Sequence, residues 1–372
     1  MITKLKLQNF KCFDDIEIPF SDLTLLAGSN GSGKSTIIQA LLLIAQSYHH
    51  SDNSFIYIEL MGKHVKLGHS NDVLYEFANE QNLRLNLEFE DWSINLNSIF
   101  ESQKTQMKIE PEVRYFGTLS LNKDGLLVAA TGLLNDRFEY IAADRISPDK
   151  VFSIFKCDDN LGIHGENVMN YLNRYGRKPI NTKLCVEGVG DELVLQLDYW
   201  LSKLFNGFCV SFKEIFQAET INLRFQEINQ QDKSNERRPI NVGFGIAYTL
   251  PVLVALLKAQ PGDLVIIENP ESHLHPKAQR LIGEIIARVV DAGVQLIIET
   301  HSDHVLNGIR LAVKRKLVSK EKIQILFTAR EDVGKKFHTN VFAPKILDNG
   351  DLDVWPEGFF DEWDNALINL LE

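Results

Sequence analysis

The stretch Gly28-Ser29-Asn30-Gly31-Ser32-Gly33-Lys34-Ser35-Thr36 is a complete phosphate-binding loop of the pattern G-x-x-x-x-G-K-[ST]. Its glycines let backbone N–H groups turn inward around a triphosphate, and Lys34 can reach the β and γ oxygens. The Ser35 hydroxyl can bind Mg²⁺. An apolar run, Leu23–Ala27, precedes the loop, and a second, glycine-free run, Ile37–Ser47, follows it. This order predicts a strand, the loop and a helix whose N-terminus points at the anion.

The composition predicts a soluble cytosolic protein. The 372 residues are enough to bury a sizeable core in one large or two to three ordinary domains. The first residues, Met1–Leu7, alternate like a strand and lack the apolar core of a signal peptide. The longest apolar stretch, near Leu250–Leu257, is too short to span a bilayer, and the scattered cysteines favour reduced thiols. The net charge of −11 argues against a generally DNA-coating surface but allows a local basic patch.

Two further motifs lie far downstream. The apolar run Leu264–Ile267 ends at Glu268, and a carboxylate at the tip of such a strand is the expected second Mg²⁺ contact beside Ser35. Another apolar run, Gln295–Ile298, leads into Thr300 and His301, where a histidine can sense the γ-phosphate. Each run alone is more simply a core strand. Their order after the phosphate loop favours a nucleotide site that binds ATP and Mg²⁺.

Three stretches resemble motifs of the ABC-type ATPases of the SMC/RecF/OLD group. They are Asn9-Phe10-Lys11-Cys12-Phe13, Glu268-Asn269-Pro270-Glu271-Ser272-His273-Leu274-His275-Pro276 and Glu299-Thr300-His301-Ser302. The resemblance implies an α/β P-loop NTPase fold, an ABC-ATPase head with a mixed sheet flanked by helices. It also implies that the basic position of Lys11 approaches the nucleotide, although a surface lysine is the plain alternative.

Four more stretches resemble a bacterial stand-alone subgroup with an uncharacterised C-terminal segment. They are Tyr140–Arg145 with Pro148, Gly165–Asn167, Asn241–Gly245 and Trp355–Phe360. The resemblance leaves the roles of Asp144-Arg145 and of Trp355–Phe360 open. Arg145 can face the nucleotide, face a partner or form a structural ion pair.

The stretch Asn241-Val242-Gly243-Phe244-Gly245 precedes an apolar, helix-like run. In the resembled heads, a glycine-bearing signature loop of one subunit completes the nucleotide site of the other. The resemblance therefore implies that Asn241, Gly243 and Gly245 meet the γ-phosphate in trans, in a homodimer formed through an ATP sandwich. The chain departs from the common serine-bearing signature, because Ala247 and Tyr248 occupy the helix start. The alternative is a simple turn at a helix start.

The acidic box also departs from the family's usual order of a Mg²⁺-binding aspartate followed by a glutamate that positions water. Here Glu268 takes the first place and Asn269 the second. An amide can orient water but cannot accept its proton, so general-base help worth roughly 10²–10⁴-fold is expected to be missing and hydrolysis to be slow. Glu271 can substitute as base, or Glu268 is itself the base, or Asn269 is only a turn residue. The catalytic candidates are Glu268, Asn269, Glu271 and His301.

The spacing of the motifs predicts four parts. Residues 1–48 form the N-terminal part of the ATPase head, and residues 49–235 form an inserted lid region that is first β-rich and then helical. Residues 236–345 complete the head, and residues 346–372 form a tail. Alternation predicts strands at Leu83–Phe89, Ser93–Leu96 and Arg114–Leu121, and apolar faces predict helices from Glu166 to about Phe216. The polar stretch Asn229–Arg238 is the best linker, and no heptad pattern predicts a coiled-coil rod.

The resemblance implies an ATP-driven switch that controls a nuclease or toxin effector in bacterial anti-phage defence. The alternatives are a nucleotide-sensing module with little turnover and a DNA-repair ATPase of the RecF type. DNA contact is open, because short basic clusters can meet phosphates or simply be solvated. These clusters are Arg174 with Arg177 and Lys178, Arg237 with Arg238, and Lys314–Lys316. No membrane partner is expected.

Overall fold

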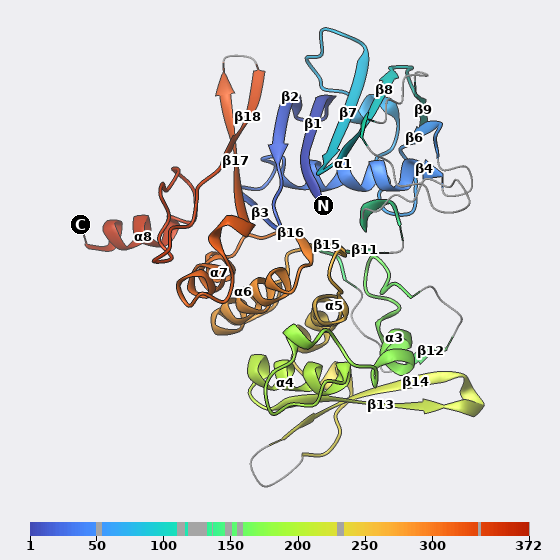
Figure 1. Cartoon of the computed structure of the whole chain (residues 1–372), viewed down its shortest axis with the longest axis vertical. Coiled ribbons are helices and arrows are strands. Elements are labelled where there is room, and N and C mark those ends of the chain that lie inside the picture. Colours follow the sequence, from blue (N-terminus) through green and yellow to red (C-terminus); the bar gives the residue numbers. More distant parts are fainter. Residues whose placement is uncertain are drawn as a thin grey trace. The chain divides into compact units, whose positions relative to one another are not determined.

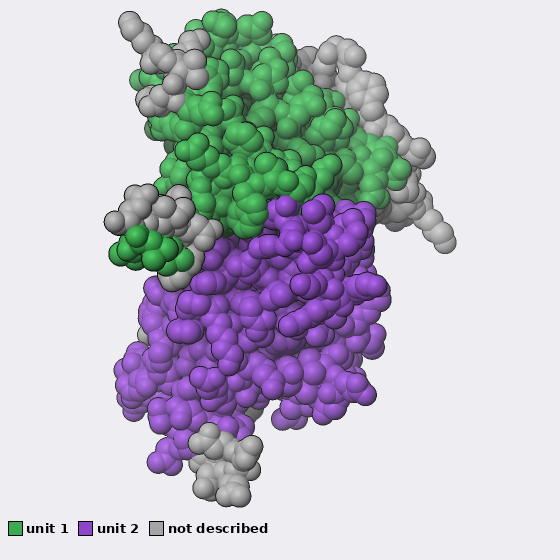
Figure 2. Space-filling view, turned by 90° about the vertical axis from the view of Figure 1, so that its left-hand side faces the viewer, with its two compact units in different colours: residues 1–138, 323–345, 353–372 green, residues 139–322, 346–352 purple. Residues whose placement is uncertain are grey.

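The computed structural model describes residues 1–49, 54–109, 116–117, 132–135, 137–145, 151–154, 159–228, 234–333 and 336–371. The chain divides into two compact units, coloured green and purple in Figure 2. Unit 1 comprises residues 1–138, 323–345 and 353–372, and unit 2 comprises residues 139–322 and 346–352. Pro148, most of the predicted strand 114–121 and residues 229–233 of the predicted linker lie outside the described residues. The four-part division stays a prediction.

Unit 1 contains a five-stranded antiparallel sheet in the order β10-β8-β7-β1-β2. The strands are β1 (Ile2–Phe10), β2 (Phe13–Pro19), β7 (Asn82–Phe89), β8 (Trp92–Ile99) and β10 (Phe116–Gly117). Strand β1 buries Leu5 and Leu7 completely, and Lys4 and Lys6 on its other face pair with neighbouring carboxylates. This alternation is that of a sheet with one solvated face. The predicted antiparallel strands at 83–89 and 93–96 are confirmed as β7 and β8, and they continue the sheet of β1.

The phosphate loop of unit 1 lies between a buried strand and a buried helix. Strand β3 (Leu23–Gly28) pairs in parallel with β17 (Ile323–Val333), which pairs antiparallel with β18 (Lys336–Phe342). Helix α1 (Lys34–Ser47) begins directly after the loop. The predicted order of strand, loop and helix is thus confirmed. Short elements complete the unit: β4 (Tyr48–His49), β5 (Ser54–Phe55), β6 (Tyr57–Glu59), α2 (Ser70–Val73), β9 (Gln106–Lys108) and the 3₁₀ turn η1 (Gly132–Leu134).

The core of unit 2 is built from short buried strands and long helices. Strands β15 (Leu264–Glu268) and β16 (Gln295–Glu299) run in parallel with Glu268 opposite Glu299, so both acidic strand ends lie at one edge. Strand β11 (Phe138–Ile141) begins at the unit boundary. The helices are α5 (Phe244–Lys258), α6 (Pro276–Asp291) and α7 (Asp303–Lys314). Figure 1 shows α6 and α7 side by side, each leading away from a strand end.

The rest of unit 2 combines helices with a three-stranded antiparallel sheet in the order β12-β14-β13. Its elements are β12 (Val151–Ser153), α3 (Val168–Tyr175), η2 (Thr182–Leu184), α4 (Leu193–Phe205), β13 (Phe208–Ile215), η3 (Phe216–Ala218), β14 (Thr220–Glu227), η4 (Pro239–Asn241) and η5 (Lys320–Lys322). The helical prediction is confirmed for α3 and α4 but is wrong for β13. Asn206 and Gly207 end α4 with positive φ angles of 55° and 107°, and the following residues pair along the whole of β14.

The C-terminal stretch packs through one aromatic residue. Phe359 is fully buried, and its ring lies 5.1 Å from the Phe327 ring of β17 and 5.5 Å from the Trp355 ring. The stretch ends in α8 (Glu362–Leu371), where Leu370 and Leu371 are exposed. The longest helix in the described ranges has 16 residues, so these ranges contain no coiled-coil rod. None of the helices in the same ranges is long and apolar enough to cross a membrane.

Helices α6 and α7 approach so closely that only glycine fits at their crossing. A Cβ atom on Gly308 would clash with the Arg280 carbonyl oxygen, and one on Gly283 would clash with the Val305 carbonyl oxygen. Interiors packed to this density do not accept even one extra methyl group without moving the backbone. The helix pair is therefore held at backbone-to-backbone contact.

We expect Gly308→Ala to lower the free energy of unfolding by about 1–3 kcal/mol, because the methyl group forces the two helices apart. Urea titration followed by circular dichroism measures this change. Gly243→Ala is the matched control, since a Cβ atom there meets nothing within 4 Å and its φ of −57° suits alanine. Equal stability of Gly308→Ala and Gly243→Ala would contradict the close-packing argument.

Candidate functional site

The predicted site residues form two groups, one in each compact unit. Lys11 and Asn30–Thr36 belong to unit 1. The acidic box with Glu268, Asn269 and Glu271 belongs to unit 2, as do His301 and the stretch Asn241–Gly245. The structure brings residues together within each group, as the following contacts show.

The backbone of the phosphate loop requires glycine at two positions. Gly28 has a φ of 145° and Gly33 a φ of 102°, in the region that L-residues rarely adopt. A Cβ atom on Gly28 would clash with the Thr328 carbonyl oxygen of the neighbouring strand. A Cβ atom on Gly33 would lie only 2.9 Å from the Phe13 ring. The glycines of the sequence pattern at positions 28 and 33 are therefore required by the backbone conformation and by the closeness of neighbouring atoms.

Side-chain contacts hold the phosphate loop in shape. The Lys34 side chain is almost fully buried, with 3% of the residue exposed, and its Nζ donates to the Gly28 and Ser29 carbonyl oxygens at 2.9 and 2.8 Å. The Ser32 hydroxyl donates to the Ser29 carbonyl oxygen at 2.7 Å and lies 2.6 Å from the Thr328 hydroxyl. Ser35, in the first turn of α1, is exposed. Orphan N–H groups at such a helix start, beside a buried ammonium group, fit a polyphosphate.

A cavity of about 210 Å³ opens beside the loop within unit 1. Its lining includes Lys11, Gly31, Tyr75, Arg330 and Thr339. The Lys11 ammonium group donates to Gln39 Oε1 of α1 at 2.7 Å, and burial lowers the pKa of Lys11. Lys11 therefore lies next to the phosphate loop, as the resemblance implies, and its contact with nucleotide stays a prediction.

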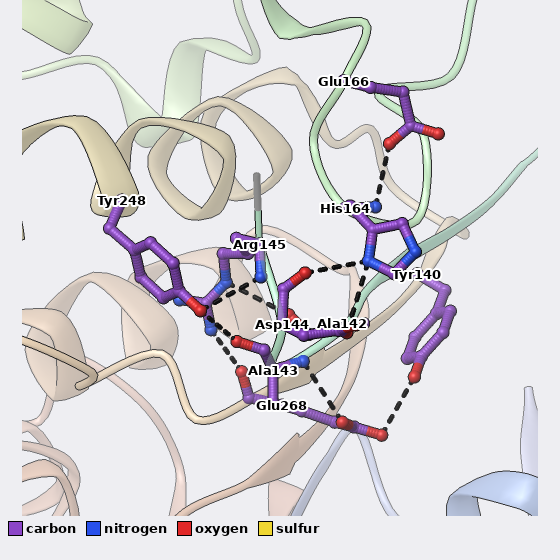
Figure 3. A network of polar contacts seen from close by, with 9 residues as sticks. All are labelled: Tyr140, Ala142, Ala143, Asp144, Arg145, His164, Glu166, Tyr248 and Glu268. Carbon is purple, nitrogen blue, oxygen red and sulfur yellow. Dashed lines mark hydrogen bonds and ion pairs between the residues drawn. The ribbon is translucent and has the colours of Figure 1, made fainter. Parts of the chain in front are cut away.

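In unit 2, both carboxylate oxygens of Glu268 are held by hydrogen bonds. The Tyr140 hydroxyl donates to Oε1 at 3.0 Å, and the Ala143 N–H donates to Oε2 at 3.2 Å (Figure 3). Burial raises the pKa of Glu268, and the two hydrogen bonds act in the opposite direction. The side chain is thus fixed in place at the end of β15, with lone pairs left on each oxygen for a cation such as Mg²⁺.

Asn269 has a structural reason for its identity. Its φ of 44° is left-handed, a conformation that asparagine tolerates better than most residues. Its N–H donates to the Glu299 carbonyl oxygen at 2.8 Å, and its buried Oδ1 has no hydrogen-bond partner within the described part of the chain. The turn geometry that we gave as the plain alternative is therefore present. A role in orienting water stays a prediction.

Glu271 and His301 are direct neighbours. Glu271 is buried, with 8% of the residue exposed, and its Oε1 accepts from the His301 N–H at 2.8 Å. Its Oε2 has no hydrogen-bond partner among the residues that the structure describes. Burial raises the pKa of Glu271, whereas the hydrogen bond from the His301 N–H and, to a lesser extent, the Thr300 side chain and the Arg145 charge act in the opposite direction. One carboxylate oxygen of Glu271 is therefore held by His301, and the other can accept a further hydrogen bond.

Arg145 is the residue whose role the sequence left open, and it lies inside the acidic box. It is buried, with 5% of the residue exposed, and burial lowers its pKa to about 10. Its Nε donates to the Ala142 carbonyl oxygen at 3.2 Å. Its Nη2 donates to the carbonyl oxygens of Glu268 and Asn269, the latter at 2.7 Å. The sequence signals for Arg145 were its position just after a short strand-like run and the resemblance of Tyr140–Arg145 to a subgroup motif, and neither specified these contacts.

The signature-like stretch lies at the start of α5. Asn241 ends the 3₁₀ turn η4, and Gly243 is the N-cap of α5 without a side-chain cap. Both residues are exposed. The flanking apolar side chains are exposed as well, Ile240 at 68% and Phe244 at 49%. Gly245 is buried, and a Cβ atom there would clash with the His273 carbonyl oxygen.

Members of the basic clusters pair with acidic neighbours. Ion pairs join Arg174 to Asp159 at 3.0 Å, Arg237 to Glu227 at 3.2 Å and Arg315 to Glu284 at 3.6 Å. Such pairs account for these arginines without a nucleic-acid partner, so DNA contact stays an untested alternative.

Family models match most of the chain in three consecutive parts. Residues 1–173 match the family described as "AAA ATPase domain". Residues 192–307 match "AAA domain, putative AbiEii toxin, Type IV TA system". Residues 318–370 match "Protein of unknown function (DUF3696)", in agreement with the predicted uncharacterised C-terminal segment.

Relatives and solved structures extend this picture. The chain is 25% identical over 320 residues to an OLD nuclease of Thermus scotoductus, a match that covers 81% of this chain and 59% of that protein. The chain thus spans under two thirds of this relative's length. Among solved structures, the SMC head domain of Thermotoga maritima has 15% identity and a TM-score of 0.47, with 92% of this chain and 98% of that chain covered. An Smc head from Pyrococcus furiosus bound to the C-terminal domain of ScpA has 13% identity and a TM-score of 0.46, with 100% and 99% covered.

We expect Glu271→Gln to stabilise the nucleotide-free protein increasingly as the pH rises from the ordinary carboxyl pKa to the raised pKa of native Glu271. The raised pKa means that native Glu271 binds more protons than unfolded Glu271 above the ordinary pKa, so wild-type stability falls as the pH rises. Glutamine keeps an acceptor for the His301 N–H but has no charge to bury. Thermal unfolding at several pH values measures this, at roughly 2 °C for each kcal/mol gained.

The exposed residue Glu187 provides the control variant, Glu187→Gln, in the same unit. We expect its melting temperature to follow the wild-type curve at every pH. A Glu271→Gln curve that runs parallel to the Glu187→Gln curve would show that burial of the Glu271 charge does not limit stability.

Proposed function

Because this chain is an ABC-type AAA ATPase of the SMC/RecF/OLD group, we propose that it is an ATP-driven switch. Two copies clamp two ATP molecules between them, slow hydrolysis releases the clamp, and the clamped form controls a partner protein. The preformed phosphate loop is the observation that carries this proposal. A buried lysine that bonds to its own loop at Gly28 and Ser29, at the start of an apolar helix, supports phosphate binding.

The residues present fit ATP and Mg²⁺. Lys34 and the N–H groups at the start of α1 would hold the phosphates, and Lys11 would line the cavity beside them. The Ser35 hydroxyl and the Glu268 carboxylate would bind Mg²⁺. The ion supplies charge neutralisation at the β and γ oxygens. Asn30–Gly33 and Thr36 would complete the cradle with their backbone and hydroxyl groups.

The exposed start of α5 supports a dimeric site. Asn241 and Gly243 present an uncapped helix N-terminus, which is a natural anion site, and exposed Ile240 and Phe244 flank it. An anion site with an apolar rim suits a surface that a second copy covers. The resemblance to ABC-type heads gives that surface its ligand, the γ-phosphate held by the other subunit.

The contacts in the acidic box favour Glu271 as the general base. Both oxygens of Glu268 already accept hydrogen bonds, whereas Glu271 keeps one buried oxygen for a water proton. A raised pKa brings Glu271 closer to the pH at which a base works best. His301 would approach the γ-phosphate next to it. The usual glutamate position is taken by Asn269, so we expect slow turnover.

The effector part of the proposal concerns bacterial anti-phage defence in the cytoplasm, with a nuclease or toxin as partner. Support comes from a matched family described with a toxin of a Type IV TA system and from an OLD nuclease relative. The toxin is named for the matched family and the nuclease activity for the relative, and their extension to this chain is part of the proposal. Affinity capture with a hydrolysis-impaired variant, with and without ATP, tests this part.

We expect a non-hydrolysable ATP analogue with Mg²⁺ to convert the protein from monomer to dimer in sedimentation experiments. Lys34→Ala should abolish high-affinity binding, because contacts between the lysine and the phosphates contribute several kcal/mol in such sites. Titration calorimetry confirms the loss of binding, and Glu187→Gln serves as the control. A monomer at saturating nucleotide would refute the sandwich, and a dimer without nucleotide would remove dimerisation as the switch.

We expect Glu271→Gln to lower the ATP turnover rate roughly 10²-fold or more, because the general base is lost. Glu268→Gln should also eliminate turnover and should weaken the dependence of binding on Mg²⁺. His301→Ala should spare ATP binding and impair turnover. Asn269→Glu should keep or raise turnover, at a stability cost of about 1 kcal/mol for a left-handed glutamate.

Steady-state phosphate release, combined with binding measurements on each variant, separates these effects. Wild-type turnover in Glu271→Gln together with lost turnover in Glu268→Gln would make Glu268 the base. Rapid turnover unaffected by either change would show that neither carboxylate is the base.

A further inference from the structure

Tyr248 lies one turn into α5, directly after the signature-like stretch, and its hydroxyl bonds to the segment that follows β11. The hydroxyl accepts from the Arg145 N–H at 3.0 Å and donates to the Ala143 carbonyl oxygen (Figure 3). Tyr248 itself is buried. The start of α5 is therefore tied to residues 143–145 by two hydrogen bonds to one side-chain oxygen.

Aromatic packing reinforces this tie. The Arg145 guanidinium carbon lies 4.9 Å from the centre of the Tyr248 ring. The Phe244 ring stacks 5.3 Å from the Tyr248 ring, and the His273 ring contacts both edge-on at 4.8 and 4.9 Å. A shift of the half-exposed Phe244 therefore reaches Tyr248 and Arg145 through close-packed groups.

The same segment holds Glu268 on its other side. The Ala143 N–H donates to Glu268 Oε2, while the Ala143 carbonyl oxygen accepts from Tyr248. Arg145 fixes the carbonyl oxygens of Glu268 and Asn269 with its side chain, while its N–H bonds to Tyr248. Ala143 and Arg145 thus each contact both the start of α5 and the acidic strand end.

We propose that Tyr248 is a positioning residue that couples the stretch Asn241–Gly245 to Glu268 of the same subunit. Engagement of that stretch with the ATP of the partner subunit sets the position of the Glu268 carboxylate. A subunit then hydrolyses its own ATP at full rate only while its own signature-like stretch is engaged. This inference rests on the proposed function, and it predicts that the two sites of a dimer turn over in a coupled manner.

The test uses mixed dimers in which the partner subunit carries Lys34→Ala, so that the tested subunit's signature-like stretch meets no ATP. Turnover per competent site, normalised to the dimer fraction in the same sample, is compared with that of dimers having two competent sites. The ratio is the turnover per competent site in dimers with two competent sites divided by that in mixed dimers. We expect a ratio of about 10 for wild-type tested subunits, which corresponds to about 1.4 kcal/mol of coupling. We expect a ratio near 1 for Tyr248→Phe, which keeps the buried ring and removes the hydroxyl.

Two other tyrosine variants make the result specific. Tyr175→Phe removes a hydroxyl that donates to Asp159 at 2.6 Å, outside this network, and should leave both turnover and the ratio at wild-type values. Tyr140→Phe removes a hydroxyl that holds Glu268 but is not bonded to α5, so it should lower turnover and keep the ratio. A role of Tyr248 in folding alone would lower the melting temperature without changing the ratio.

A wild-type ratio in Tyr248→Phe dimers would overturn the coupling while leaving the switch itself intact. Absence of ATP-dependent dimers in sedimentation would instead overturn the proposed function and the coupling together. Should Tyr248→Phe fail to fold, the ratio for Arg145→Lys decides, because lysine cannot reproduce the planar contacts to Tyr248 and to the two carbonyl oxygens. A wild-type ratio there would overturn the coupling as well.

Discussion

In each compact unit, a buried cation held by main-chain carbonyl oxygens organises the candidate site residues. In unit 1 it is the Lys34 ammonium group, bonded to the carbonyl oxygens of Gly28 and Ser29. In unit 2 it is the Arg145 guanidinium, bonded to Ala142, Glu268 and Asn269. A charge removed from water is tolerated only when such partners replace its hydration. The chain must therefore wrap around each cation in one way, and that requirement fixes the shape of the loops around it.

Much of the fold could be predicted because its signals are local. A pattern within a dozen residues is enough to recognise the phosphate loop, the strands β15 and β16, and the strands β7 and β8. Strand β13 could not be predicted, since its identity depends on pairing with β14 rather than on its own pattern. The contacts of Arg145 escaped prediction for the same reason. They join residues more than 100 positions apart, and periodicity contains no information about such distances.

The acidic box shows how far residue identity alone can mislead. The prediction that Asn269 orients water considers only its amide, whereas its left-handed backbone accounts for an asparagine at this position without a catalytic role. Two carboxyl groups, the half-buried Glu268 and the buried Glu271, share the field of the Arg145 guanidinium. Burial raises the pKa of both, and hydrogen bonds to different partners act in the opposite direction, Tyr140 and Ala143 for Glu268 and His301 for Glu271. The surroundings of the two carboxyl groups therefore differ in ways that the order of residues in the sequence does not reveal.

The glycine contact between α6 and α7 has a consequence for how the site can move. Glu271 lies just before α6 and His301 just before α7, and a hydrogen bond of 2.8 Å joins them. Helices locked at backbone contact do not slide past each other, since any register shift would collide main chain with main chain. The contact between the helices therefore keeps Glu271 and His301 at a fixed distance from each other. A displacement of either helix carries the other with it, and Glu271 and His301 keep their hydrogen bond while the helix pair moves as one body.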